Sequence, residues 1–299
     1  MRDSFSFVGE RPASPLPIIK TRRDRKGLPY ISIGLLAVLV MGCLGAELVA
    51  TKDPAYLDLQ NVAVAPSGEF LFGTDTLGRD IFSCIWYGGR VSLWIGFLAT
   101  VLSTVLGVVY GTLSGLAPKW VDAVLMRLTE LILSIPGLLT VLFVQAIFGR
   151  PNVWSVSVAI GVTSWCSIAK IVRMEVRQIR ECEYVTAARC MGGGFFYLLH
   201  RHLAPNFLPS ILFMVVMNLR SAIGMETVLS FLGMGLPLET VSWGSMLSLA
   251  EKAVLGGMWW MILIPGAFLV TLMMSVTNVG NYLRKNANRK ENPLVQKGA

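Results

Sequence analysis

The stretch "ECEYVTAARCMGGG", residues 181–194, is a short polar segment in a chain that otherwise consists largely of long apolar runs. Glu183 near its start favours the N-terminus of a helix, because an acidic side chain complements the positive end of the helix dipole. Gly192 and the two glycines after it favour the end of that helix, because glycine adopts the backbone geometry with which helices commonly terminate. The stretch therefore predicts a short helix followed by a tight turn.

This helix and turn belong to a longer polar loop over residues 173–206. A second helical piece, "FFYLLHRH", follows the glycines, and Pro205 precedes the next apolar run. Ala187 and Ala188 give the first helix a small, smooth face. A projecting pair of helices with a small-residue face suits docking into a groove on a soluble partner.

The rest of the chain has the composition of a membrane protein. Of its 299 residues 54% are hydrophobic and 15% are charged, with a mean hydropathy of +0.62; a soluble domain has roughly 25% charged residues. A helix needs about 20 apolar residues to cross the hydrocarbon core. Six such runs predict an all-α protein with six transmembrane helices, near residues 29–50, 91–115, 128–148, 153–172, 207–234 and 256–281.

The net charge of +8 is explained by the topology of the chain in the membrane rather than by nucleic-acid binding. Lys and Arg tend to stay on the cytoplasmic side of a membrane protein. With a cytoplasmic N-terminus, 20 of the 26 basic residues lie on the inner side, in residues 1–28, 116–127, 170–206 and 282–299. We therefore expect a multi-pass protein of the cell membrane, surrounded by lipid, with both termini in the cytoplasm and no nucleic-acid partner.

The first apolar run, 29–50, could be mistaken for a signal sequence. It is longer than a typical signal-peptide core and begins unusually late, so we predict a membrane span. The sequence "LVMGC" at 39–43 resembles a lipoprotein cleavage box, which leaves processing at Cys43 as an alternative.

An outer segment over residues 51–90 separates the first two spans. Within "FGTDTLGRDIFSCIWYGGR", apolar residues such as Ile81 and Ile85 share one helical face. This pattern suits a helix that lies in the membrane interface, with Asp75 as a possible cap at its beginning. Most of the remaining chain, residues 91–283, forms one membrane core, and residues 284–299 form a cytoplasmic tail.

Glycine and proline suggest how the spans pack and bend. Gly107, Gly111 and Gly115 recur at four-residue spacing, which predicts a face where another helix can approach closely. Pro136 and Pro265 each remove a backbone hydrogen bond, so we expect bends in the third and sixth spans.

Two charged residues, Arg220 and Glu226, lie inside the fifth span. Charges within a membrane are costly and usually face a cavity or a partner. Their six-residue separation places them about 120° apart around a helix, so we expect no direct pairing. Either residue could form part of a pathway or gate, and a structural hydrogen-bonding role is the alternative for both.

No motif in the sequence predicts a metal, a cofactor or a catalytic centre. The only two histidines, His200 and His202, point in nearly opposite directions on a helix. Cys182 and Cys190 do not have the spacing of a zinc site. Asp75 and Asp80 alone would make a poor cation site. A Gly-rich "GxxxxGK[ST]" motif for ATP is also absent from the sequence.

The stretch at residues 181–194 resembles the cytoplasmic "EAA" loop of ABC importer permeases. Its residues fit the form "EYVxAARxxG" of the dipeptide, oligopeptide and nickel permease family, with "RHLAPN" downstream. The resemblance implies that the ATPase subunits dock on Glu183, Ala187, Ala188, Arg189 and Gly192.

Three further stretches are similar to the same family, in the same order. They are "FGTDTLGRDIFSCIWYGGRVSL" at 72–93, "MRLTELILSIPGLL" at 126–139 and "LSFLGMGLPLETVSWGSML" at 229–247. The first is similar to the segment that marks the C-type subunit. The resemblance covers residues 30–284, with Cys84 in place of the usual Arg and Arg220 in a span that is normally uncharged there.

This resemblance implies the type I ABC importer permease fold and the role of a transmembrane subunit rather than an enzyme. The expected partners are a second homologous permease, two ATP-binding subunits that hold ATP and Mg, and an extracytoplasmic solute-binding protein. The chain itself would bind no cofactor and would form half of a pathway for di- or oligopeptides. Nickel or a metal chelate is the alternative cargo.

Two rival classes make different predictions. An ion-coupled secondary transporter often carries inverted repeats and binds its ions near the bilayer midplane. No such repeat is visible in the sequence, and the loop over 173–206 would have no role. A membrane-embedded enzyme would need a catalytic pair or a metal motif in a span, and none is evident.

Overall fold

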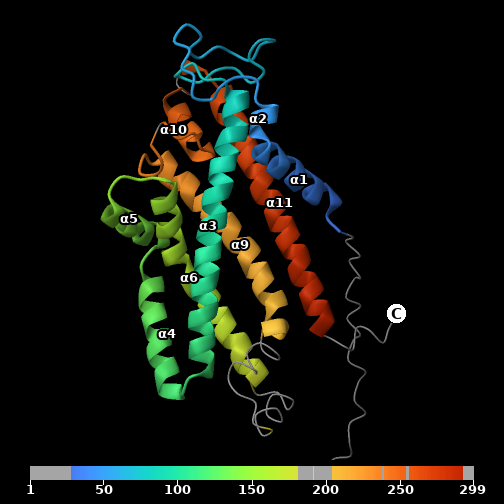
Figure 1. The fold of residues 1–299 in the computed structure, drawn as a ribbon, viewed down its shortest axis with the longest axis vertical. Coiled ribbons are helices and arrows are strands. Elements are labelled where there is room, and N and C mark those ends of the chain that lie inside the picture. Colours follow the sequence, from blue (N-terminus) through green and yellow to red (C-terminus); the bar gives the residue numbers. More distant parts are fainter. Residues whose placement is uncertain (1–27, 181–190, 192–203, 238, 254–255, 292–299) are drawn as a thin grey trace, which may run out of the picture.

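The computed structural model describes residues 28–180, 191, 204–237, 239–253 and 256–291 (Figure 1). Within these residues the regular structure is helical, apart from an isolated bridge between Thr74 and Asp80. The predicted all-α class is therefore confirmed. The α-helices of the described residues are α1 (Tyr30–Leu44), α2 (Ala46–Val49), α3 (Ile81–Leu116), α4 (Lys119–Ser134), α5 (Gly137–Phe148), α6 (Val153–Arg180), α9 (Ala204–Phe231), α10 (Trp243–Ala253) and α11 (Trp260–Glu291).

Four helical segments of the described residues are long and apolar enough to cross a membrane. They are Ile81–Leu116, Val153–Arg180, Ile211–Phe231 and Trp260–Asn286. The pair α4 and α5 makes a fifth if it is taken as one bent span. The first predicted span is divided at Gly45 into α1 and α2, and the 15 residues of α1 fall short of the usual spanning length. The count of six spans stays a prediction.

The long helices lie side by side, and their ends define two ends of the bundle (Figure 1). We call the end where α6 finishes and α9 begins the loop end, because residues 181–203 connect these helices. The beginning of α4 and the end of α11 also lie there. Residues 51–80 and α10 lie at the opposite end (Figure 1). This arrangement places three of the four predicted inner regions at one end of the bundle.

The glycine face predicted in the second span is the contact between α3 and α6. A Cβ atom added at Gly107 would lie 2.7 Å from Cβ of Ile168, and one at Gly111 would lie 2.8 Å from Cβ of Val172. At Gly115 it would lie 2.8 Å from Cγ1 of Val176. Real side chains do not approach so closely, so the two helices can pack at this distance only because α3 has no side chains there. The predicted packing seam is confirmed.

The predicted third span is a corner rather than one helix. Helix α4 ends at Ser134 and α5 begins at Gly137, and their axes differ by 92°. Ile135 before Pro136 has an extended backbone, as the proline ring requires of the residue that precedes it. The expected bend at Pro136 is therefore a break. Pro265, in contrast, lies inside α11, which continues to Glu291.

The predicted interfacial helix is instead the beginning of α3. Residues 81–90 continue without interruption into the second span, and Ile81 and Ile85 are buried in the core. The cap is Asp80, whose carboxylate accepts a hydrogen bond from the backbone N–H of Ser83 at 3.0 Å. Asp75, which was expected to cap this helix, forms a buried ion pair with Arg79 at 2.7 Å. Both expectations failed because the loop before α3 folds back on the bundle.

Candidate functional site

The predicted docking residues lie outside the part of the chain that the structure describes. They are Glu183, Ala187, Ala188, Arg189 and Gly192. Helix α6 ends at Arg180 and α9 begins at Ala204, and only Met191 is described between them. Both helix ends lie at the loop end of the bundle (Figure 1). The docking role of these residues therefore stays a prediction.

Next to this loop, an ion cluster joins α6 to the corner between α3 and α4. At its centre is Asp122 of α4, which is 3% exposed. Its carboxylate accepts a short hydrogen bond from Nε of Arg173 and a second from Nη2 at 2.5 Å. Arg177 lies 3.1 Å away and the Ser114 hydroxyl donates at 2.6 Å. The paired geometry of Arg173 favours a defined orientation of α6 against α4.

Arg180 extends the same contact to the end of α3. Its Nη1 donates to the carbonyl oxygens of Leu116 at 3.2 Å and Gly115 at 3.5 Å. These carbonyls are at the C-terminus of α3, where the helix leaves its last acceptors unsatisfied and a cation is favourable. Arg173, Arg177 and Arg180 thus hold one face of the last turns of α6 against α4 and the end of α3. We call these arginines with Asp122 and Ser114 the loop-end cluster.

Glu226 lies in the packed core under α10. Its side chain is fully buried, and it accepts hydrogen bonds from the hydroxyls of Ser92 and Ser230 at 3.0 Å and of Ser242 at 2.8 Å. These serines belong to α3, α9 and the segment before α10. The backbone N–H of Trp243 also donates to Ser92. The described contacts of Glu226 are those of a structural network, and a gate role stays a prediction.

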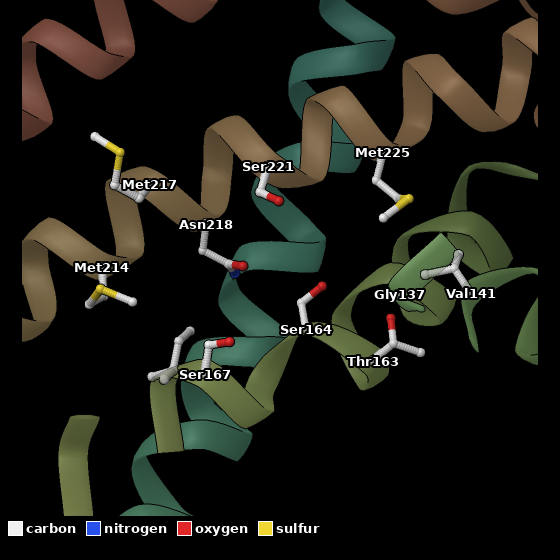
Figure 2. Close-up of a pocket in the computed structure, with 11 residues that line it drawn as sticks. Gly137, Val141, Thr163, Ser164, Ser167, Met214, Met217, Asn218, Ser221 and Met225 are labelled. Atoms are coloured by element: carbon white, nitrogen blue, oxygen red, sulfur yellow. The ribbon is translucent and has the colours of Figure 1, made fainter. Parts of the chain in front are cut away.

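A cavity of about 300 Å³ lies between α5, α6 and α9 (Figure 2). Ser164 and Ser167 of α6 point into it across from Asn218 and Ser221 of α9, as Figure 2 shows. The polar residues of the lining carry no formal charge, and methionines make up much of the remainder. The lining consists of Gly137, Val141, Thr163, Ser164, Ser167, Ile168, Met214, Met217, Asn218, Ser221 and Met225.

Several polar groups of this cavity are available to a ligand or to water. The Thr163 hydroxyl is used within its own helix, where it donates to the carbonyl of Ala159 at 2.9 Å. Asn218 donates through Nδ2 to Ser103 at 2.5 Å, and no described residue donates to its carbonyl oxygen. The remaining three, Ser164, Ser167 and Ser221, form no side-chain hydrogen bond with another described residue.

Arg220 lines a second cavity, of about 490 Å³, between α9 and α11. It is exposed, and no ion pair or hydrogen bond joins its guanidinium to another described residue. The other lining residues belong to α11 and are Val270, Met273, Met274, Thr277 and Asn278. The two cavities therefore flank one exposed face of α9.

Within the described residues, no group of three or more His, Cys, Asp or Glu side chains could hold a metal ion. The carboxylates at the centre of each polar cluster have other partners. Asp122 faces arginines and Glu226 faces serine hydroxyls.

Comparison with known proteins gives the family of this bundle. Residues 104–287 match the model of the family described as "Binding-protein-dependent transport system inner membrane component". The match covers more than half of the chain and includes the helices around both cavities. The chain belongs to this family of permeases.

Two relatives extend the likeness beyond the matched region. The permease is 36% identical over 245 residues to the dipeptide transport system permease protein DppC of Bacillus subtilis (strain 168), covering 82% of this chain and 76% of the relative. It is 33% identical over 257 residues to the oligopeptide transport system permease protein OppC of the same organism, covering 86% and 84%. The predicted resemblance to the dipeptide and oligopeptide permeases is confirmed.

A solved structure supports the fold. A chain of the MetNI methionine ABC transporter, in an inward-facing conformation, matches with a TM-score of 0.53 and 16% identity. The match covers 69% of this permease and 97% of that chain. The type I ABC importer permease fold predicted from the sequence is therefore confirmed.

Neither the uncharged cavity nor the loop-end cluster of this permease was predicted from the sequence. Signals for both were present. Arg173, Arg177 and Arg180 recur at helical spacing, which predicts a basic stripe in need of an acceptor. The pairs Ser164 with Ser167 and Asn218 with Ser221 each stand three residues apart, which places them on one face of a span.

Proposed function

We propose that this permease forms half of a translocation pathway for di- or oligopeptides in an ATP-driven importer. The observation that carries the proposal is the sequence similarity of this chain to a dipeptide permease (36% identical) and an oligopeptide permease (33% identical). Each alignment covers more than 80% of the chain. The family is described as binding-protein-dependent, which supports delivery of the solute by an extracytoplasmic binding protein. An ion-coupled secondary transporter receives no support from these relatives.

The exposed face of α9 is our candidate for the pathway wall. It carries Ser221 and Arg220, which are both exposed, within a membrane span, and such groups are unfavourable against lipid. A second, homologous permease would close this face and complete the pathway. Hydroxyl and amide groups can bond the backbone of any peptide, and methionines adapt to side chains of different shape. This combination favours a route that tolerates many peptide sequences.

Helix α6 is our candidate for the element that couples this wall to ATP. It carries Ser164 and Ser167 in the cavity and, further along, the arginines of the loop-end cluster. Arg180 lies 16 residues after Ser164, a distance of about 24 Å along a helix. Movement of an ATPase subunit docked at Glu183, Ala187, Ala188, Arg189 and Gly192 would thus reach the cavity through one continuous helix.

In this assembly two partner subunits bind ATP and Mg and hydrolyse the nucleotide. Their closure and reopening alternate the access of the pathway between the two sides of the membrane. A population shift of this kind requires that the partners contact the two states of the permease differently. The loop-end cluster supports such a transmission because it fixes the last turns of α6 against α3 and α4.

Uptake by the complete complex tests this function. The permease, its homologous partner, the ATPase subunits and the binding protein are reconstituted in vesicles with ATP inside, and labelled dipeptide and Ni²⁺ uptake are measured separately. We expect dipeptide uptake that requires ATP and the binding protein and persists with ionophores. Uptake of Ni²⁺ without peptide uptake would favour the metal importer, and loss of uptake on adding ionophores would favour ion coupling.

A further inference from the structure

Arg220 occupies the middle of a membrane span. It lies nine residues after Ile211 and eleven before Phe231, the two ends of that span. At 1.5 Å per residue, both ends are about 14 Å or more away along the axis. This distance exceeds the reach of one side chain, so snorkelling to lipid headgroups does not explain how the charge is accommodated.

Within the described residues, Arg220 has no counter-charge. No described residue forms an ion pair with Arg220, and the two cavities that flank α9 contain no other charged side chain in their linings. Thr277 and Asn278 of α11 add a hydroxyl and an amide to the cavity that Arg220 lines. The local field is therefore positive, which attracts anions and repels metal cations.

The position of Arg220 on α9 relates it to the uncharged cavity. Ser221 is its neighbour in sequence and Met217 precedes it by three residues, so all three lie within roughly 100° around the helix. Ser221 and Met217 line the first cavity, while Arg220 lines the second. A solute that moves along the exposed face of α9 passes all three side chains.

We propose that Arg220 binds the carboxylate of the peptide as it passes through the pathway. This proposal rests on the proposed peptide-importer function and adds a chemical preference to it. Peptides with a free carboxylate would pass more readily than the same peptides with a neutral end group. A solvent-accessible arginine suits this role, because a transport site must bind its solute weakly enough to release it.

A carboxylate from the second permease is the competing partner for Arg220. A permanent ion pair in the membrane interior is stable only with close geometry and with its other hydrogen-bonding groups satisfied. The cavity of about 490 Å³ beside Arg220 offers room for water and for a small anionic group instead. The arrangement therefore favours a transient ligand. Removal of the Arg220 charge gives different results for a peptide carboxylate and for a carboxylate of the second permease.

The test compares peptides that differ only at the carboxyl end. Pairs of tripeptides, free or amidated, are chosen for equal measured affinity for the binding protein, and their uptake rates are measured in reconstituted vesicles. Wild-type permease should prefer the free acid about fivefold, as expected for an accessible ion pair of about 1 kcal/mol. Arg220→Gln should bring the ratio near one, and Arg220→Lys should retain most of the preference.

Arg284→Gln is the matched control. Arg284 also belongs to the α9 and α11 pair, but it stacks over Phe213 at 5.1 Å and lines neither cavity. This variant should keep the wild-type ratio. An unchanged ratio in Arg220→Gln, or separation of the two permeases in that variant on size-exclusion chromatography, would overturn the proposal. Failure of wild-type permease to import any peptide would instead refute the proposed function on which it rests.

Discussion

Glu226 shows how one residue holds three elements of the permease together. Its carboxylate accepts hydrogen bonds from three serine hydroxyls, one each in α3, α9 and the segment before α10, and the side chain is not exposed to solvent. A buried carboxylate is costly unless such donors surround it. The network therefore makes the position specific for a side chain that can accept several hydrogen bonds at once.

We expect Glu226→Ala to destabilise the permease. The hydroxyls of Ser92 and Ser242 would lose their acceptor, and each unsatisfied buried group costs about 1–3 kcal/mol. Thermal unfolding of the purified protein in detergent should show a clearly lower midpoint temperature for Glu226→Ala than for wild type. The midpoint of Glu226→Gln should lie between these two values. Glu251→Ala, at an exposed position of α10, should unfold like wild type. Equal midpoints for both alanine variants would contradict the structural role.

The α3–α6 seam works at the scale of elements, because it depends on the absence of side chains along a whole helix face. We expect Gly111→Leu to force the helices apart, since even its Cβ would lie 2.8 Å from that of Val172. Overpacking of this kind costs about 1–3 kcal/mol. Gly266→Leu is the control, because nothing lies within 4 Å of a Cβ at that position in α11. Similar losses of folded protein in both variants would show that the seam is not special.

The loop-end cluster gives a prediction about coupling between elements. Asp122→Asn would leave the guanidiniums of Arg173 and Arg177 without their common carboxylate. We expect the variant to assemble with the ATPase subunits. It should hydrolyse several times more ATP for each imported peptide than the wild-type permease, because α6 is no longer held against α4. The measurement is the ratio of ATP hydrolysed to peptide imported in vesicles.

Glu130→Gln is the control for this prediction. It removes an acid from the same helix, but its pair with Arg127 is exposed. The ratio should stay at the wild-type value in this variant. An unchanged ratio in Asp122→Asn as well would show that the cluster does not transmit movement of the loop.

At the scale of the whole molecule, the orientation in the membrane can be measured with introduced cysteines. The described natural cysteines, Cys43, Cys84 and Cys166, are buried and should not react readily. We expect an impermeant maleimide to label Glu69→Cys in intact cells and Lys119→Cys only after lysis, both with Cys182 and Cys190 replaced by serine. Glu69 and Lys119 are exposed, and the segment 51–80 that contains Glu69 lies at the opposite end of the bundle from the beginning of α4, which is Lys119. The reverse pattern would overturn the predicted topology.

The sequence by itself determined the features of this permease that depend on local pattern. Long apolar runs predict the spans, because lipid requires about 20 apolar residues in a helix. The spacing of Gly107, Gly111 and Gly115 predicted the seam, and Pro136 predicted a bend that the structure extends to a break, because each acts within its own helix. The docking residues around Glu183 were also predicted by pattern, and their role stays a prediction.

Only the tertiary structure decided which polar groups meet. Glu226 binds Ser92 across 134 residues of sequence, and Asp122 binds Arg173 across 51. Arg220 and Glu226, which the sequence presented as similar charges in one span, differ because Arg220 faces a cavity and Glu226 faces α3 and the segment before α10. The rotation of each helix about its axis sets these partners. That rotation results from the packing of all the helices together, which the pattern of one segment does not contain.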